Sequence, residues 1–476
     1  MLPPSVDPQP QRHTVQHEGV SRHGGAHYTQ TGGRIGPVLS EEQNRRLTEV
    51  GAGTPMGELL RRYWMPIAAV AELDDNPIKP VRLMGEDLVL YKDRTGNYGL
   101  VDRHCAHRRA DLSYGWVEDC GLRCHYHGWR WDHTGRCLDQ PFEEVSHPEA
   151  RFKDRVRLKA YAVEPKAGLV WAYLGPPPAP LVPTWEPFTW RNGFVQIVFS
   201  EVPCNWFQCQ ENSIDPVHFE WLHSNWTRTL NRLDGDKPPR HLKIGFDEFE
   251  YGFTYRRILE GQSERDELWT VGRTCLWPNC LFTGGHFEWR VPIDDQNMLS
   301  VGWFFDRVPN EMEPFTQDRI PSWYSPIKDP RTGRWITTHI MNQDFVAWVG
   351  QGTVADRTQE HLGQSDRGVI MMRKTILEEA ELVARGGEPR AVIRDQEKNV
   401  SVRLPIIGRD FFLKGYSLAE GEKRERTPGL AQRKDFPFLT GQPEEIRVAF
   451  RRAMGLDPEK IWRTQFSASA PRIRLC

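Results

Sequence analysis

Residues 103–131 read RHCAHRRADLSYGWVEDCGLRCHYHGWRW, and this stretch decides what kind of fold the chain builds. It contains the pair Cys105-x-His107 and, after sixteen further residues, the pair Cys124-x-x-His127. Two short Cys/His pairs in loops can converge on one metal centre. A zinc site with two cysteine and two histidine ligands is the simplest such centre, and it stays open as an alternative.

The order and surroundings of the two pairs favour an iron–sulfur cluster over zinc. Each pair supplies one thiolate and one imidazole, so the two cysteines can bind one iron and the two histidines the other, as in a Rieske [2Fe–2S] cluster. Gly128-Trp129 suits a tight loop that shields the cluster, and the flanking pattern is that of strands rather than the helix of a zinc finger. Cys120 and Cys137 lie outside the pattern, and we do not expect them to be ligands.

The string Cys-x-His followed by Cys-x-x-His-Gly-Trp closely resembles the signature of the Rieske family. The resemblance implies one [2Fe–2S] cluster per subunit, bound by Cys105, His107, Cys124 and His127.

A second stretch, ENSIDPVHFEWLHS at 211–224, carries two histidines among apolar and aromatic residues. Successive residues of an α-helix turn by about 100°, so His218 and His223, five positions apart, would point about 140° from one another. They cannot share a helix face as the i, i+4 histidines of a metalloprotease do. Either they are buried histidines that only form hydrogen bonds, or the helix ends or widens between them so that both reach one ion.

Beside the Rieske signature, this stretch resembles the catalytic motif Asn-x-x-Asp-x-x-His-x-x-x-x-His of Rieske non-haem iron oxygenases. The resemblance assigns Asn212 and Asp215 to catalysis, and His218 and His223 to one mononuclear iron(II) per subunit. The third ligand is a distant aspartate, which matches Asp344 in MNQDFVAWVGQG; a capping or surface acid is the alternative. Such a 2-His-1-carboxylate site leaves one face of the iron open for O2, the co-substrate, and for the substrate.

Asp215 has two compatible interpretations. Because Pro216 follows it, it fits a helix N-cap with proline at the first helical position. In the family that the motif resembles, this aspartate connects the cluster of one subunit to the iron of the next. The resemblance therefore implies that His127 of one chain hydrogen-bonds Asp215 of its neighbour, which orients His218, and that the protein is a homo-oligomer, either a trimer or stacked trimers.

The composition is that of an ordinary globular protein. The 476 residues are enough for two or more domains, with 38% hydrophobic residues, 26% charged residues and a formal net charge of −2. This balance indicates neither nucleic acid nor a membrane surface as a partner. No apolar run reaches the roughly 18–20 residues that span a bilayer. The N-terminus lacks the apolar core of a secretory signal, so we expect a cytoplasmic protein.

Sequence patterns divide the chain into three parts. Residues 1–40, rich in Pro, Gly, Gln and His, predict an extended arm. Residues 41–180 are predicted to form the Rieske domain together with the two helices that precede it. The first of these helices begins with a capping box at Ser40-x-x-Gln43. The proline run PPPAPLVP at 176–183 indicates the boundary with the third part, residues 181–476.

The third part predicts a catalytic domain. A strand comes before the second motif, which is predicted to be helical, and an antiparallel sheet and a long helix follow it. The predicted strands of the whole chain are 81–93, 98–102, 168–175, 193–202, 249–259, 268–277, 286–293 and 297–308, and the long helix is 369–387. The predicted fold class is therefore α+β: an all-β Rieske domain followed by a helix-grip-like catalytic domain of antiparallel sheet and helices.

Electrons have to come from another protein. The chain shows no Gly-x-Gly-x-x-Gly after a strand and no Cys-x4-Cys-x2-Cys run, so it carries neither a dinucleotide domain nor a ferredoxin. A separate NAD(P)H reductase, with or without a ferredoxin, is the expected partner. A Rieske electron carrier without oxygenase activity is the alternative from another functional class.

The segments GAGTPMGELLRRYWMPIA, VPIDD and QGTVADRTQEHLGQSDRG resemble the phthalate dioxygenase-type branch of the family, over about residues 40–400. That branch includes ring dioxygenases and O-demethylases of lignin-derived aromatic acids such as 5,5'-dehydrodivanillate. The resemblance implies oxidative O-demethylation of a methoxylated aromatic acid, with ring dihydroxylation of a phthalate-like acid as the alternative.

An aromatic carboxylate calls for arginine forks in an otherwise apolar pocket. Arg257 and Arg273, on predicted strands of the catalytic domain, are the candidates, and outward-facing ion pairs are the alternative for both. His286 is a candidate for contact with a substrate hydroxyl.

Overall fold

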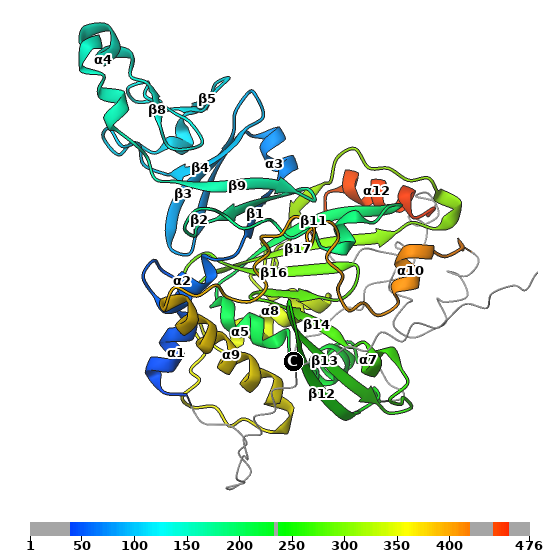
Figure 1. Ribbon diagram of the computed structural model, residues 1–476. Coiled ribbons are helices and arrows are strands. Elements are labelled where there is room, and N and C mark those ends of the chain that lie inside the picture. Colours follow the sequence, from blue (N-terminus) through cyan, green and yellow to red (C-terminus); the bar gives the residue numbers. More distant parts are fainter. Residues whose placement is uncertain (1–38, 233–236, 419–440, 457–476) are drawn as a thin grey trace, which may run out of the picture.

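The computed structural model describes residues 39–232, 237–418 and 441–456 (Figure 1). Three β-sheets follow one another: a six-stranded sheet, a four-stranded sheet inserted within it, and an eight-stranded sheet that carries most of the helices. The α+β fold class predicted from the sequence is confirmed. The predicted arm at 1–40 lies outside the described residues except for its last two positions.

The six-stranded sheet has the order β1-β10-β9-β4-β3-β2. Its strands are β1 (Met65–Ala69), β2 (Ile78–Leu83), β3 (Glu86–Lys92), β4 (Tyr98–Asp102), β9 (Ala160–Lys166) and β10 (Leu169–Tyr173). The strand predicted at 81–93 is interrupted, because Met84 and Gly85 take positive φ angles of 47° and 78° and turn the chain from β2 into β3.

Between β4 and β9 the chain leaves this sheet and forms a separate unit, here called the inserted lobe, residues 103–157. It contains β5 (Trp116–Val117), β6 (Leu122–Arg123), β7 (Arg130–Trp131), β8 (Cys137–Asp139) and α4 (Pro141–Ser146). Figure 1 shows the lobe at one end of the molecule, beyond β3 and β4.

Strand β3 buries both of its faces, which explains its continuous apolar run. Leu88 and Leu90 belong to the main hydrophobic core, whereas Val89 and Tyr91 belong to a small second core that also holds Cys105 and Cys124. Successive side chains of a strand point to opposite faces, so one strand serves both cores. The inserted lobe is therefore packed directly onto the sheet that carries it.

The eight-stranded sheet has the order β12-β13-β14-β15-β16-β17-β11-β18. Its strands are β11 (Gly193–Val202), β12 (His241–Phe249), β13 (Gly252–Leu259), β14 (Arg273–Leu276), β15 (Cys280–Phe282), β16 (His286–Pro292), β17 (Met298–Arg307) and β18 (Ser322–Tyr324). Neighbours pair antiparallel as predicted, except that the short β18, which was not predicted, runs parallel to β11.

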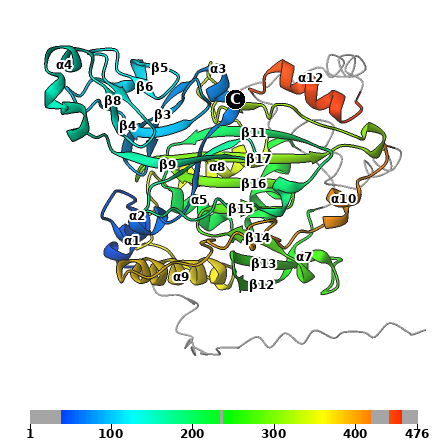
Figure 2. The same ribbon diagram turned by 45° about the horizontal axis from the view of Figure 1, so that its top comes forward.

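The alternation in β16 gives this sheet two different faces. On one face the ring of Trp289 packs edge-on against Trp171 of β10, with centroids 5.2 Å apart. On the other face Arg290 lies over the ring of Trp348, on helix α8 (Ile340–Gly350), at 5.3 Å. The apolar face therefore joins the two large sheets, and the polar face is turned towards helices. Figure 2 shows α5 (Trp206–Asn212) and α8 beside this sheet.

The capping box predicted at the first helix is confirmed. The N–H of Gln43 donates to Oγ of Ser40 at 3.1 Å, and the N–H of Ser40 donates to Oε1 of Gln43 at 3.0 Å. The predicted long helix at 369–387 ends before Gly386, which has a φ of 80°. That long helix is α9 (Arg367–Ala384).

The remaining helices are α1 (Glu41–Thr48), α2 (Pro55–Leu60), α3 (Val70–Asp75), α6 (Thr227–Leu230), α7 (Glu267–Thr270), α10 (Arg409–Lys414) and α12 (Glu444–Ala453). The 3₁₀ turns are η1 (Leu112–Tyr114), η2 (Pro148–Ala150), η3 (Phe152–Arg155), η4 (Glu186–Thr189), η6 (Asn310–Met312) and η7 (Gln364–Asp366).

The strand predicted at 268–277 is wrong in its first half. The N–H of Thr270 donates to the carbonyl of Asp266 at 2.9 Å and closes the single helical turn α7. Gly272, with a φ of 76°, then reverses the chain into β14. The apolar residues of this segment alternate poorly, and a local turn satisfies the backbone there.

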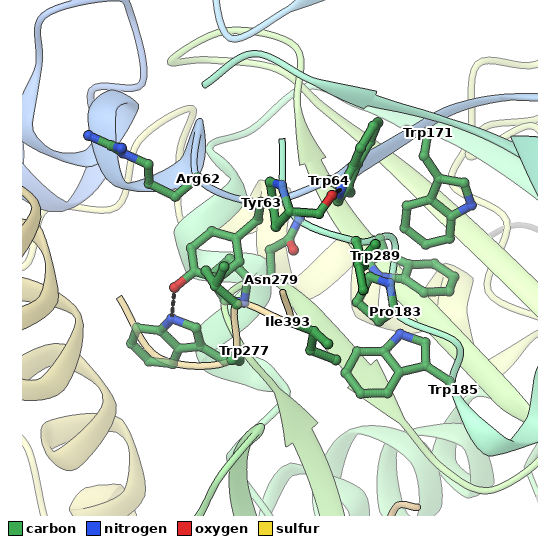
Figure 3. A pocket seen from close by; sticks show the side chains of 15 residues that line it. Arg62, Tyr63, Trp64, Trp171, Pro183, Trp185, Trp277, Asn279, Trp289 and Ile393 are labelled. Atoms are coloured by element: carbon green, nitrogen blue, oxygen red, sulfur yellow. Dashed lines mark hydrogen bonds between the residues drawn. The ribbon is translucent and has the colours of Figure 1, made fainter. Parts of the chain in front are cut away.

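The two large sheets share one hydrophobic core that continues across the predicted boundary at 176–183. A cavity of about 40 Å³ lies at this seam. Its lining side chains are drawn in Figure 3, where the hydroxyl of Tyr63 accepts a hydrogen bond from the indole of Trp277; the two atoms are 2.8 Å apart. The volume holds a water or two, and none of the lining residues is a histidine, cysteine or carboxylate. The seam is therefore packing, and the division near residue 180 stays a prediction.

Among the described residues, no helix is both long and apolar enough to cross a bilayer.

Candidate metal centres and active site

Two loops of the inserted lobe adopt the same turn around the cysteines of the first motif. In each loop the cysteine N–H donates to the carbonyl five residues later, and the N–H four residues later donates back to the cysteine carbonyl. Both turns place a left-handed residue at that fourth position, Arg109 with a φ of 59° and Gly128 with 74°. The four hydrogen bonds are Cys105 to Ala110 at 2.9 Å, Arg109 to Cys105 at 2.9 Å, Cys124 to Trp129 at 2.8 Å and Gly128 to Cys124 at 3.1 Å.

The two loops place their thiols and their imidazoles on different sides. Cys105 and Cys124 are 1% and 2% exposed and lie together, whereas His107 and His127 are exposed, with ring centroids 4.5 Å apart. The hydrogen bond between the two thiols raises the pKa of Cys105 and lowers that of Cys124 to about 6. Paired thiols on the buried side and paired imidazoles on the outer side fit an asymmetric two-iron cluster. A single zinc ion would not require this separation of thiols from imidazoles.

Trp129 covers one side of this arrangement, as the Gly-Trp sequence predicted. Its ring is 5% exposed and stacks on His107 with centroids 4.4 Å apart and an interplanar angle of 8°. Stacking of this kind fixes the imidazole plane and keeps water from the interior side of the loop.

A π-helix answers the question raised by the spacing of His218 and His223. Residues Phe219–Trp226 form the π-helix η5, in which each turn closes between residues five apart. The Oγ of Ser224 donates to the carbonyl of Phe219 at 3.0 Å, which also spans five residues. The helix has widened between the histidines, and their rings lie 5.1 Å apart between centroids.

Helix α8 brings Asp344 to these histidines. Its Oδ1 lies 3.3 Å from Nε2 of His223 and 3.8 Å from Nε2 of His218. One ligand atom from each of the three lies within 4.8 Å of the others, and the side chains are 7–12% exposed. Burial opposes the charge of His223 most strongly, but the Asp344 carboxylate outweighs it and raises the pKa of His223. Two imidazoles and one carboxylate in this arrangement are the donor set of a mononuclear iron(II) site.

Two amide side chains hold the three groups in place. The Oε1 of Gln343 lies 3.0 Å from Nδ1 of His223, and its Nε2 donates to Oγ1 of Thr227 and to the carbonyl of Thr337, each at 2.9 Å. The Nδ2 of Asn212 donates to Oδ1 of Asp344 at 3.3 Å. Asn212, which the motif had singled out, therefore contacts the carboxylate. Gln343 had not been predicted, although it directly precedes Asp344.

Asp215 lies at the edge of the same site. Its Oδ2 is 3.6 Å from Nδ1 of His218, and its Oδ1 accepts the N–H of Val217 at 2.8 Å. The predicted N-cap role is wrong, because the π-helix that follows begins at Phe219 with His218 as its N-cap. Burial opposes its charge most, but His218 and the Val217 N–H outweigh that effect and lower the pKa of Asp215. The side chain is 32% exposed, so a group from outside the chain can reach it.

Helix α5, which carries Asn212, is anchored by a buried ion-pair network that the sequence did not reveal. Glu211 accepts from Nε and Nη2 of Arg357 at 2.9 and 2.7 Å, and from Nε of Arg373 on α9 at 2.6 Å. Burial opposes this charge most strongly, but Arg357 and Arg373 together outweigh it and lower the pKa of Glu211.

Comparison with known proteins finds matches to both parts of the chain. A family model of the Rieske [2Fe-2S] domain matches residues 63–159, and a model described as LigXa C-terminal domain like matches residues 289–404. The 5,5'-dehydrodivanillate O-demethylase oxygenase subunit of Sphingobium sp. (strain NBRC 103272 / SYK-6) is 56% identical over 422 residues, which cover 89% of this chain and 98% of that one. The phthalate 4,5-dioxygenase oxygenase subunit of Pseudomonas putida is 31% identical over 434 residues, covering 80% and 95%.

The chain belongs to the Rieske oxygenases of the phthalate dioxygenase type. Its inserted lobe is accordingly part of a Rieske [2Fe–2S] domain. The fold of this oxygenase is shared with a solved structure, NdmB of Pseudomonas putida CBB5, at a TM-score of 0.52 and 19% identity, covering 72% of this chain and 95% of that one. That likeness concerns the fold alone.

The two arginines predicted for substrate lie next to the histidine pair of the oxygenase. The guanidinium groups of Arg257 on β13 and Arg273 on β14 lie 4.5 and 4.7 Å from the ring centroid of Phe219, which follows His218. Within the described residues neither guanidinium has an ion-pair or hydrogen-bond partner, and Arg257 is only 7% exposed. The predicted alternative of outward-facing ion pairs is wrong for both. Burial, and then the charge of Arg273, lowers the pKa of Arg257 to about 10, so this guanidinium remains cationic at neutral pH.

The third substrate candidate, His286, lies on the same face of the sheet but three strands from β13. Its ring stacks on Phe304 with centroids 4.2 Å apart, and its Nε2 is buried without a hydrogen-bond partner in the described residues. Burial above all lowers the pKa of His286 to about 3, so the ring is neutral. Glu288 and Arg290, two and four residues further along β16, form a buried ion pair at 3.1 Å that the alternation of HFEWR could have revealed.

Proposed function

We propose that this chain is the terminal oxygenase subunit of an O-demethylase acting on a methoxylated, lignin-derived aromatic carboxylic acid such as 5,5'-dehydrodivanillate. The observation that carries the proposal is the pair of the buried Arg257 and the half-buried Arg273 beside the two histidines and Asp344, which has no ion-pair partner within the described residues. Holding two cations in a buried site without an anion costs free energy unless a substrate carboxylate pairs with them. The 56% identity to a 5,5'-dehydrodivanillate O-demethylase subunit supports the same substrate class.

The proposed ligands of the mononuclear iron(II) are His218, His223 and Asp344, one iron per subunit. One donor atom from each lies within 4.8 Å of the others, and their chemistry suits a divalent metal with imidazole and carboxylate ligands. When bound, the iron supplies activation of O2, the co-substrate, at its open face. Gln343 holds the ring of His223, and Asn212 holds the carboxylate of Asp344.

The cluster is proposed to be bound by Cys105, His107, Cys124 and His127, as the motif predicts. It receives single electrons from a separate NAD(P)H reductase, with or without a ferredoxin, in the cytoplasm where NAD(P)H is available. The overall reaction balances as methoxyarene, O2, NAD(P)H and a proton giving hydroxyarene, formaldehyde, water and NAD(P)⁺.

Electron transfer between the two centres is proposed to cross a subunit boundary. Figure 1 shows the inserted lobe at one end of the chain and α5 and α8 well away from it, with the six-stranded sheet between. The exposed imidazole of His127 and the partly exposed carboxylate of Asp215 fit a contact between neighbouring chains in a trimer or in stacked trimers. Asp215 then accepts from His127 of the neighbour and orients His218 of its own chain.

Ring dihydroxylation of a phthalate-like acid is the second candidate, because the same arginine pair suits phthalate and the chain is 31% identical to a phthalate 4,5-dioxygenase subunit. The two candidates differ in which carbon the site presents to the iron. The test supplies the reconstituted oxygenase, a reductase, NADH and a panel of methoxylated and unmethoxylated aromatic acids. Stoichiometric formaldehyde from a methoxylated acid supports the proposal, whereas a cis-diol without formaldehyde would replace it with the second candidate.

A further inference from the structure

A buried pair between the π-helix η5 and strand β12 has no part in the chemistry described so far. Glu220, on η5, accepts the main-chain N–H of His241 at 2.8 Å with Oε2, and the same oxygen lies 3.0 Å from Nδ1 of that ring. The side chains of His241 and Glu220 are 8% and 9% exposed. The carboxylate fixes the ring and its tautomer: Nδ1 carries the proton and donates to Glu220, so Nε2 is a hydrogen-bond acceptor.

That acceptor has no partner. Within the described residues Nε2 of His241 is buried and receives no hydrogen bond. A bracing role for the pair needs only Nδ1 and the main chain, whereas an orphaned buried ring nitrogen destabilises the site until a ligand satisfies it. Burial, above all, and the cation of Arg257 act to lower the pKa of His241, which keeps the ring neutral.

Strand register places His241 beside the arginine pair. His241 on β12 is directly opposite Leu259 of β13, and Leu259 shares its strand face with Arg257, two residues earlier. Arg273 on β14 is in turn a diagonal neighbour of Arg257, because it pairs with Tyr255. Diagonal neighbours on one face lie about 7–8 Å apart, within reach of long side chains. His241, Arg257 and Arg273 therefore form one diagonal row across three adjacent strands.

We propose that Nε2 of His241 accepts the hydrogen bond of a phenolic hydroxyl on the substrate, ortho to the methoxyl group that is attacked, while Arg257 and Arg273 bind the carboxylate. This inference rests on the proposed function and deepens it. The substrate carries a carboxylate and a phenolic hydroxyl at opposite ends of one aromatic ring. The row of His241, Arg257 and Arg273 offers two cations for the carboxylate and a hydrogen-bond acceptor for the hydroxyl. His286 is a poorer candidate for this hydroxyl, because no hydrogen bond in the described residues holds its ring and it lies three strands from β13.

The consequence is a preference for guaiacyl-type acids. A phenol donates to Nε2, but its methyl ether cannot, and it leaves the buried nitrogen unpaired while adding a methyl group. Sites built around a hydrogen bond reject the analogue that lacks it more strongly than apolar pockets reject a change of size. The oxygenase should therefore bind vanillate and 5,5'-dehydrodivanillate more tightly than the same acids with their phenols methylated.

Two substitutions separate this role from a bracing role. In His241→Asn the amide nitrogen occupies roughly the position of Nδ1 and keeps the Glu220 contact, but nothing replaces Nε2. In His241→Gln the amide reaches roughly the position of Nε2 and the Glu220 contact is weakened. Lys243→Ala on the same strand, which removes an exposed ion pair with Glu264 at 2.6 Å, is the matched control.

The experiment measures equilibrium binding of 5,5'-dehydrodivanillate and of its phenol-methylated ether to the anaerobic, iron-loaded oxygenase by calorimetry, without turnover. We expect wild type and Lys243→Ala to prefer the phenol by about 10–100-fold. His241→Asn should lose that preference through weaker binding of the phenol alone, and His241→Gln should retain part of it.

If His241→Asn kept the full preference for the phenol over its methyl ether, the assignment would be overturned and the His241–Glu220 pair would have a structural role only. Equal binding of the two ligands by wild type would overturn it as well. If wild type bound neither ligand and released no formaldehyde, the proposed function itself would fall; if wild type bound and demethylated the phenol while His241→Asn kept the preference, only the His241 assignment would fall.

Discussion

Gln343 and His223 are joined across the interface between α8 and η5, with Oε1 of the amide 3.0 Å from Nδ1 of the ring. Because Gln343 is itself held by Thr227 and Thr337, it fixes the orientation in which Nε2 of His223 faces Asp344. Outer partners of this kind tune a metal site nearly as strongly as its ligands.

Replacing Gln343 should therefore weaken the mononuclear iron site without touching the cluster. For Gln343→Ala we expect iron(II) affinity to fall by about 10–100-fold. Titration of the apo site with iron(II), followed by equilibrium dialysis, measures it. Gln359→Ala, in an exposed loop, is the control; an affinity equal to wild type in Gln343→Ala would mean that the amide only packs.

The two metal centres should be separable by single substitutions. His218→Ala, His223→Ala and Asp344→Ala are expected to abolish turnover and to lower iron content while leaving the EPR signal of the reduced [2Fe–2S] cluster unchanged. Cys124→Ser should remove that signal and leave iron bound at the mononuclear site. Loss of the cluster signal in His218→Ala would contradict the assignment of the ligands.

Mixed oligomers test whether electrons cross between chains. A His218→Ala chain keeps its cluster and a Cys124→Ser chain keeps its mononuclear site, so neither homo-oligomer should turn over. Co-expressed and purified as mixed oligomers, they should regain a measurable part of wild-type activity, because one chain's cluster serves its neighbour's iron. No recovery in verified mixed oligomers would show that each chain works alone.

The arginine pair should determine substrate affinity more than the rate of the bound complex. A charge-assisted hydrogen bond contributes about 1.5–3 kcal/mol, so Arg257→Gln and Arg273→Gln should each raise KM by about 10–100-fold with a smaller change in kcat. Arg256→Gln is the matched control, since Arg256 is the neighbour of Arg257 on the opposite strand face and pairs with Asp247 at 2.7 Å. Unchanged KM in both pocket variants would contradict carboxylate binding there.

Glu211 should make stability depend on pH in the acid range. Its folded-state pKa is lowered, so the carboxylate contributes stability that is fully present above the unfolded value of 4.5 and is lost as pH falls through the folded-state pKa. Glu211→Gln leaves Arg357 and Arg373 without their anion and should cost about 3–5 kcal/mol at pH 7.

The difference in thermal midpoint between this variant and wild type should narrow as pH is lowered below 4.5, because wild type then loses the same charge. Tryptophan fluorescence of the two proteins at several pH values measures it. Glu378→Gln, whose carboxylate is 62% exposed on α9, should show no such trend. A constant difference across the range would contradict a stabilising charge at Glu211.

Local sequence was sufficient for those features that short-range chemistry specifies. The spacing of Cys105, His107, Cys124 and His127 predicted the two ligand loops, and Ser40 and Gln43 predicted a capping box that the structure contains. The five-residue spacing of His218 and His223 predicted that the helix must end or widen between them if both were to reach one ion. Strand β11 was predicted at its observed bounds because its apolar pattern is regular and its ends carry turn residues.

Only the tertiary structure decided which distant side chains meet. Asp344 reaches the histidines, and Gln343 reaches His223, because α8 packs against η5; nothing within α8 records that contact. Within the described ranges, the lack of an ion-pair partner for Arg257 and the pairing of His241 with Glu220 depend on strand register and on which sheet face the helices cover. Periodicity shows that a strand has two faces, but burial, and hence the electrostatic cost of a charge on either face, exists only once the sheet is packed.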